Sequence, residues 1–167
     1  MLRVLLLVMS FPVWAFPIWA GPVAEAPVEV DVELVLAVDT SRSMDYEELV
    51  LQRHGYAAAI EHPAVLSRIK EGLLGRIAVL YFDWGSDGRN QIIVPWTIVE
   101  TAEDAAKIAA KLRQSPVQDL FGTGISGASK LGIREIETNG FEGLRRGIDV
   151  SGDGPNNSGS PVTVARD

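Results

Sequence analysis

The fold of this chain is decided by one stretch, Val32-Glu33-Leu34-Val35-Leu36-Ala37-Val38-Asp39-Thr40-Ser41-Arg42-Ser43. The part before Asp39 is almost continuously apolar, which is typical of a strand buried on both faces of a parallel sheet. Asp39 ends this run, and Ser41 and Ser43 follow it at alternate positions. The stretch therefore predicts a buried strand with a carboxylate and two hydroxyls at its carboxyl end.

The sequence after this stretch alternates between helical and strand patterns. We expect helices over 45–61, 101–113 and 124–136, and strands over 76–82, 91–96 and 144–150. The glycine-rich turn at 85–88 predicts a hairpin between two of these strands. Pro63 predicts the end of the first helix, and Thr101 with Asp104 predicts the start of the second. This order of elements indicates a mixed α/β sheet with helices on its faces.

Composition limits the classes of function. The 167 residues are 47% hydrophobic, enough for the core of one domain. The formal charge of -7 argues against a nucleic-acid partner, because binding phosphates needs clustered Lys and Arg. The absence of Cys excludes disulfides and thiolate metal sites.

Residues 1–20 are more apolar than the rest of the chain and contain a single charged side chain. Arg3 precedes an apolar run, and Ala20 offers a small residue for cleavage, so residues 1–20 are predicted to be a signal peptide. The alternative is an uncleaved membrane anchor, which the prolines and the short apolar core suit poorly. We expect a linker over 21–29 and a domain over 30–167. Export without any cysteine favours a periplasmic or secreted protein of a bacterial envelope.

Three polar loops belong to the same predicted edge of the sheet. The first carries Asp39, Ser41 and Ser43, the second carries Thr123 in a glycine-rich approach to a helix, and the third carries Asp153 directly after a strand. Open α/β sheets bind ligands at the carboxyl ends of their strands. Carboxylate and hydroxyl oxygens suit a hard divalent cation.

The spacing of Asp39-x-Ser41-x-Ser43, Gly122-Thr123 and Asp153-Gly154 resembles the metal-ion-dependent adhesion site of von Willebrand factor type A domains. The resemblance spans residues from about 30 to 165. It implies a three-layer α/β fold with a doubly wound, mostly parallel sheet. Such a fold normally continues with further strands, so we expect this chain to be a fragment that lacks them. The polar strand before Asp153 departs from the family pattern.

By this resemblance the metal residues are Asp39, Ser41, Ser43, Thr123 and Asp153, and the cation is Mg²⁺, with Mn²⁺ or Ca²⁺ as alternatives. In the family, an acidic group of a protein partner completes the coordination of the cation. The resemblance therefore implies a module for adhesion or protein interaction, without catalytic residues. Elementary electrostatics agrees, because a cation held by few charged ligands attracts an incoming carboxylate.

Several other interpretations of the same residues remain open. Asp39 and Ser41 would also suit an ordinary turn that caps the following helix. Asp149-x-Ser151-x-Asp153-Gly154 imitates the first half of a calcium-binding loop, although Ser160 stands where its bidentate glutamate belongs.

Catalytic interpretations find less support. Gly124-Ile125-Ser126-Gly127-Ala128 resembles a nucleophile elbow but follows no strand. His54 and His62, on or just after the first helix, have no triad pattern, so we expect structural roles for both. A metal-dependent hydrolase or phosphotransferase would need a placed general base and a phosphate-binding loop, and this sequence shows neither. A scaffold whose metal only stiffens the loops is the remaining alternative.

Acidic residues near the predicted hairpin could serve a second cation or partner contact. The simpler interpretation is that Asp83, Trp84 and Asp87 belong to a solvated turn, and we predict this.

Overall fold

The computed structural model describes residues 26–41, 44–152, 154–161 and 163. The elements along the chain are β1 (Val28–Asp39), α1 (Tyr46–Glu61), α2 (Pro63–Lys70), β2 (Ile77–Trp84), β3 (Asn90–Val99), α3 (Ala102–Gln114), α4 (Ile125–Glu137) and β4 (Phe141–Ser151). Every predicted strand and helix is present, and α2 is additional. The predicted signal peptide over 1–20 lies outside the described residues. Within those residues, no helix has the length and apolar character needed to cross a membrane.

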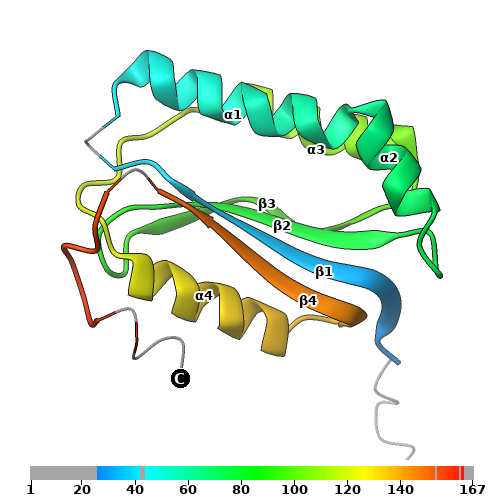
Figure 1. Cartoon of the computed structure of the whole chain (residues 1–167). Coiled ribbons are helices and arrows are strands. Elements are labelled where there is room, and N and C mark those ends of the chain that lie inside the picture. The colour runs from blue at the N-terminus through cyan, green and yellow to red at the C-terminus, as the bar shows by residue number, and fades with distance from the viewer. Residues whose placement is uncertain (1–25, 42–43, 153, 162, 164–167) are drawn as a thin grey trace, which may run out of the picture.

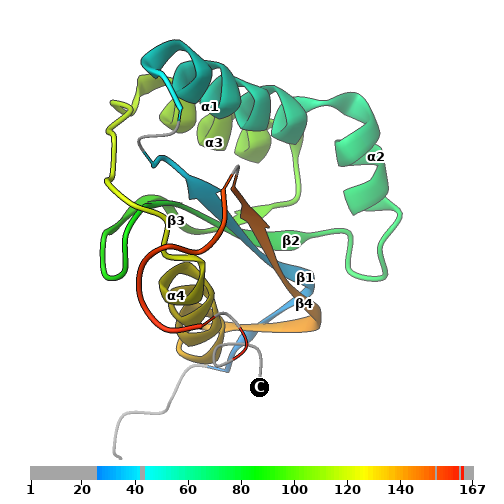
Figure 2. The same ribbon diagram turned by 60° about the vertical axis from the view of Figure 1, so that its left-hand side comes forward.

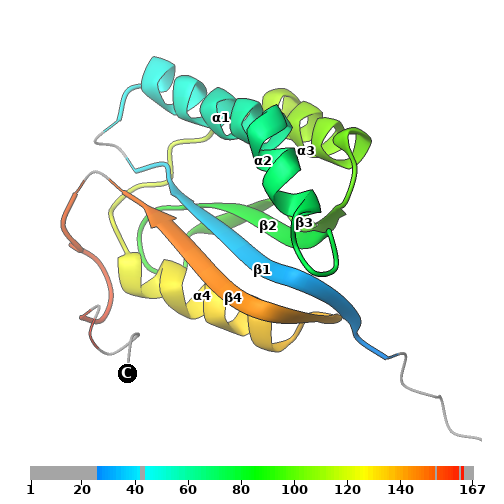
Figure 3. The same ribbon diagram turned by 45° about the vertical axis from the view of Figure 1, so that its right-hand side comes forward.

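A four-stranded sheet in the order β3-β2-β1-β4 forms the middle of the molecule. β1 runs parallel to both β2 and β4, whereas β3 is antiparallel to β2, which confirms the predicted hairpin. Helices α1, α2 and α3 cover one face of the sheet and α4 covers the other (Figure 1). The ribbon turned to either side shows the same three layers (Figure 2 and Figure 3). The predicted mostly parallel α/β fold is thus confirmed.

Two hydrophobic cores hold the layers together, one on each face of the sheet. Alternate residues of β1 point to opposite faces, as the pleat of a strand requires. Val38 belongs to the core under α1 and α3, and Ala37 to the core over α4. All residues of β2 are buried. The apolar runs of the sequence are therefore central strands covered on both sides.

Side-chain caps fix where the helices begin. Asp45 Oδ1 accepts the backbone N–H of Glu48, whose carboxylate accepts the N–H of Asp45, so a capping box starts α1. Thr101 and Asp104 form the predicted box at α3.

The first helix ends where Pro63 predicts, but a second helix begins at that residue. Proline suits the first position of a helix because its missing N–H would have no partner there. His62 completes this start: its Nδ1 accepts the N–H of Ala64 at 3.2 Å. The structural role expected for His62 is therefore a helix cap, while His54 lies exposed on α1.

The solvated turn predicted for Asp83 and Trp84 is wrong. Both residues belong to β2 and are buried, at 0% and 1% exposure, because the strand runs further than its apolar residues suggest. Asp83 pairs with Arg53, a buried residue of α1. Asp87 does lie exposed in the hairpin turn, as predicted.

A buried carboxylate on β1 joins this strand to β4. Glu33 of β1 is fully buried, and its carboxylate accepts hydrogen bonds from Asn139, from the backbone of Gly143 and from Arg146. A buried carboxylate satisfied by three donors avoids the cost of an unpaired charge. This cluster ties β4 to β1 at the end of the sheet far from Asp39.

Candidate metal centre

The candidate site lies at the carboxyl ends of β1 and β4, which are neighbours in the sheet. The helix that follows β1 covers one face, and the helix that precedes β4 covers the other (Figure 3). This is a topological switch point, where loops diverge and leave space for a ligand. The loops after β1, before α4 and after β4 all reach this edge.

The loop after β1 is buried and tightly turned. Asp39, Thr40 and Ser41 are at most 2% exposed. Asp39 Oδ1 accepts the N–H of Ser41 at 2.8 Å, and the N–H of Thr40 donates to the carbonyl of Trp84 at 2.9 Å. Ser43 lies outside the described residues. Because Asp45 itself caps α1, Asp39 and Ser41 do not supply that cap, and the capping interpretation of these two residues is wrong.

The loop before α4 is joined by main-chain hydrogen bonds to the first loop and to the turn between β2 and β3. The N–H of Leu120 donates to the carbonyl of Thr40 at 2.8 Å, and the N–H of Gly124 donates to the carbonyl of Gly85 at 2.8 Å. A β-carbon on Gly85 would lie 2.0 Å from the carbonyl oxygen of Leu120, so only glycine allows this approach. Thr123, in this loop, is 5% exposed.

The loop after β4 contacts both of the others. A β-carbon on Gly152 would lie 3.3 Å from Asp39 Oδ2, and one on Gly154 would lie 4.0 Å from Thr123 Oγ1. Asp153, between these glycines, lies outside the described residues. The residues on either side of it thus approach the carboxylate of Asp39 and the hydroxyl of Thr123.

The oxygens gathered at this edge fit a hard divalent cation. Asp39, Ser41 and Thr123 offer one carboxylate and two hydroxyls, all on buried residues. Within the described part of the chain, no group of three or more His, Cys, Asp or Glu could hold a metal. Among these three residues only Asp39 carries a charge, and none offers a histidine or thiolate ligand.

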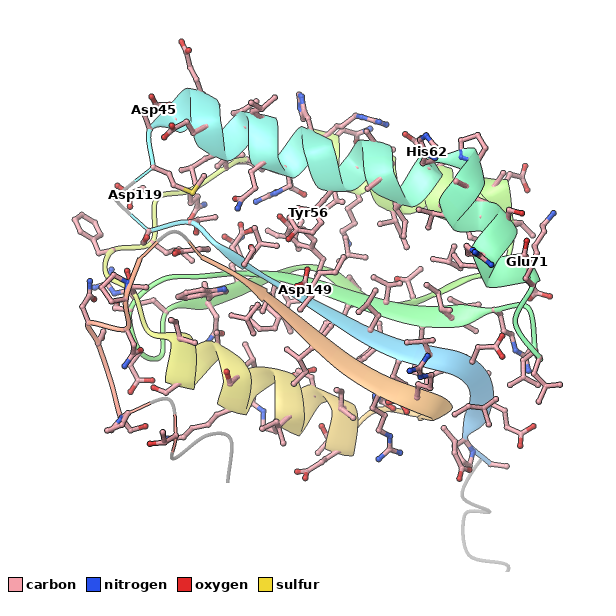
Figure 4. All side chains as sticks on the ribbon, viewed as in Figure 1. Asp45, Tyr56, His62, Glu71, Asp119 and Asp149 are labelled. Carbon is pink, nitrogen blue, oxygen red and sulfur yellow. The ribbon has the colours of Figure 1, made fainter. Side chains whose placement is uncertain are left out.

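The structure argues against two of the alternative interpretations. Asp149 and Ser151 lie on β4, within a strand paired with β1, so they are not residues of a calcium-binding loop. Figure 4 shows Tyr56 and Asp149 between α1 and β4. Burial raises the pKa of the Tyr56 hydroxyl, and Asp149 adds to that rise. Ser126 is fully buried in the first turn of α4, unlike the exposed serine of a nucleophile elbow.

Sequence reasoning missed a buried ion pair close to the site. Arg53 Nη2 donates to Asp83 Oδ2 at 2.5 Å, and the guanidinium lies over the ring of Tyr81. Burial raises the pKa of Asp83 to about 6, although Arg53 acts in the opposite direction. The signal in the sequence was the position of Arg53 between Leu49 and Ala57, at the spacing of a buried helix face.

Comparisons with solved structures show the fold. The mussel byssus proximal thread matrix protein 1, solved with a zinc-occupied MIDAS motif, matches 84% of this chain with a TM-score of 0.58 and 16% identity. A D319A mutant of the PilB minor pilin from Streptococcus sanguinis matches 77% with a TM-score of 0.53 and 13% identity. The vWF domain of the pilus tip protein Mfa5 from Porphyromonas gingivalis matches 71% with a TM-score of 0.47 and 18% identity.

The chain spans only part of each of these solved proteins: 35% of the mussel protein, 30% of the pilin and 36% of the Mfa5 domain. No curated protein matched it by sequence. A family model described as a protein of unknown function, DUF1194, matches residues 29–167. The chain therefore belongs to the DUF1194 family, and its domain has the fold of von Willebrand factor type A domains.

Proposed function

We propose that this protein binds a divalent cation at the carboxyl edge of β1 and β4 and, through it, an acidic group of a protein partner. Asp39, Ser41, Ser43, Thr123 and Asp153 would hold the cation, some directly and some through water. Mg²⁺ is the proposed ion, with Mn²⁺ and Ca²⁺ as alternatives. The predicted signal peptide, residues 1–20, would direct the domain to the periplasm or outside the cell.

The observation that carries this proposal is the convergence of three loops on Asp39. Its carboxylate is fully buried beside Gly152, and Thr123 is held in the neighbouring loop by main-chain bonds. Burying a charge is costly unless an opposite charge or donors compensate it. A divalent cation at this edge would provide such an opposite charge beside the Asp39 carboxylate.

The chemistry of such a site favours binding. A cation held by one or two carboxylates keeps most of its positive charge, so a carboxylate from a partner gains a strong contact. Two proteins of similar fold support this role, since one was solved with a zinc-occupied MIDAS motif and the other is a minor pilin. We therefore propose a module for adhesion or protein interaction without enzymatic activity.

Calorimetry tests the proposal directly. Protein freed of metal with EDTA is titrated with MgCl₂, MnCl₂ and CaCl₂, and one binding event is expected for at least one cation. A short peptide with a single aspartate should then bind the metal-loaded protein, whereas its asparagine analogue should not. Absence of heat with all three cations would contradict the proposal. Metal-dependent turnover of phosphoester or ester substrates would instead favour the hydrolase alternative.

A further inference from the structure

The segment that follows β4 forms hydrogen bonds with the carbonyl, the N–H and the hydroxyl of Thr123. The N–H of Asn157 donates to the carbonyl of Thr123 at 2.9 Å, and the N–H of Ser158 donates to the same carbonyl at 3.0 Å. The side chain of Asn157 makes two more contacts: its Oδ1 accepts the N–H of Thr123 at 2.8 Å, and its Nδ2 donates to Thr123 Oγ1 at 3.4 Å.

The orientation of the Asn157 amide follows from these contacts. A backbone N–H can only donate, so the amide oxygen must face the N–H of Thr123, and the NH₂ group is then left toward the hydroxyl. In this arrangement the hydroxyl oxygen accepts one hydrogen bond and keeps a second lone pair. That lone pair is what a hydroxyl offers to a cation.

The same contacts join two of the loops of the candidate metal centre. Asn157 is only a few residues beyond Asp153, while Thr123 precedes α4. Gly122 allows the loops to meet: its φ of 75° lies in the left-handed region, and a β-carbon there would lie 2.9 Å from the Ser86 side chain and 3.8 Å from Asn157 Oδ1. The loops after β4 and before α4 are thereby fixed relative to each other.

We propose that Asn157 is a positioning residue, which orients the Thr123 hydroxyl toward the cation and holds the segment after β4 against the loop of Thr123. This inference rests on the proposed function, because it assumes that Thr123 is a metal residue. Residues that orient metal ligands contribute about 10- to 100-fold to metal affinity. Since the bond from Nδ2 to Oγ1 is long, the effect expected here is about tenfold, at the lower end of that range.

A double-mutant cycle on the whole protein tests the role of Asn157. We compare Asn157→Ala, Thr123→Val and the double variant by their dissociation constants for Mn²⁺, measured by calorimetry and by electron paramagnetic resonance of free Mn²⁺. Asn157→Ala should weaken binding about tenfold in the wild-type background and have no effect once Thr123→Val has removed the hydroxyl. A loss of the same size in both backgrounds would show a general structural role and overturn the proposal.

Asn156→Ala is the matched control. Asn156 is the preceding residue in the chain, but its Nδ2 donates to the carbonyl of Ser160 instead of to Thr123. It should leave Mn²⁺ affinity unchanged. If Thr123→Val leaves no binding to measure, equal affinities of Asn157→Ala and Asn156→Ala overturn the proposal. If the wild type itself binds no cation, the proposed function fails, whereas wild-type binding that Asn157→Ala leaves intact refutes this inference alone.

Discussion

Replacing Asp39 with asparagine is expected to weaken Mg²⁺ and Mn²⁺ binding by more than about 100-fold, because a direct ligand should matter more than the residues that orient ligands. The amide keeps the shape of the side chain and can still accept the N–H of Ser41, which Asp39 Oδ1 accepts at 2.8 Å in the wild type. It removes the negative charge that the cation requires. Isothermal calorimetry of the Asp39→Asn variant measures the loss.

The thermal midpoint provides a second measurement on the same variant. A cation that binds only the folded state stabilises it by about 2.7 kcal/mol at a concentration 100 times the dissociation constant. Mg²⁺ should therefore raise the Tm of the wild type but not that of Asp39→Asn. Asp87→Asn is the matched control, since Asp87 is an exposed acid in the nearby hairpin turn. Equal Mg²⁺ stabilisation of wild type and Asp39→Asn would contradict the assignment of Asp39.

The second large effect concerns stability. Asp83→Asn should lower the free energy of unfolding by about 3–5 kcal/mol, because it leaves the buried guanidinium of Arg53 without a counter-charge. Because burial raises the pKa of Asp83 to about 6, its carboxylate is charged at pH 8, and the loss is therefore compared at that pH. Urea unfolding of the wild type and Asp83→Asn at pH 8 measures it.

Arg53→Met should behave differently with pH. Asp83, whose pKa is already raised to about 6 in the folded protein, would rise further without Arg53 and could become neutral by taking up a proton. A carboxyl with a raised folded pKa gives stability that is present below its unfolded pKa and is lost as pH rises through the folded value. The free energy of unfolding of Arg53→Met should thus increase by up to about 1.4 kcal/mol for each pH unit lowered in that window.

The double variant Arg53→Met with Asp83→Leu is the control for this pair. Replacing both charges by apolar side chains leaves no uncompensated charge, so its stability should return close to that of the wild type. Asp31, Glu61 and Asp104 have lowered pKa values, so their stabilising interactions are lost only at more acidic pH. These three acids therefore do not change the free energy of unfolding between pH 5 and 8. A flat pH dependence of Arg53→Met would contradict this account of Asp83.

Much of the fold could be predicted because its signals are local. The apolar run before Asp39 and the turn at 85–88 predict a central strand and a hairpin from adjacent residues alone. Helix α2 was missed because Pro63 is both a stop signal for one helix and a favourable first residue for the next. The chain direction at such a residue depends on packing, which short patterns do not contain.

The contacts around the site were less predictable because they join residues distant in sequence. Asp83 follows an apolar run just as Asp39 does, yet it is paired with Arg53, whereas Asp39 lies beside Gly152. The two acids differ only in what tertiary packing brings near them. The bond from Asn157 to Thr123 likewise depends on how two loops meet at the edge of the sheet.

The location of the cation is tested most directly by paramagnetic broadening of backbone amide signals with Mn²⁺. Substoichiometric Mn²⁺ should first broaden the amide signals of Thr40, Ser41, Thr123 and Gly152, at the carboxyl edge of the sheet. Signals of α2, which lies toward the opposite end of the molecule, should stay sharp (Figure 1). Broadening centred on the exposed acids in the first turn of α1, or spread evenly over the surface, would contradict a cation site built around Asp39.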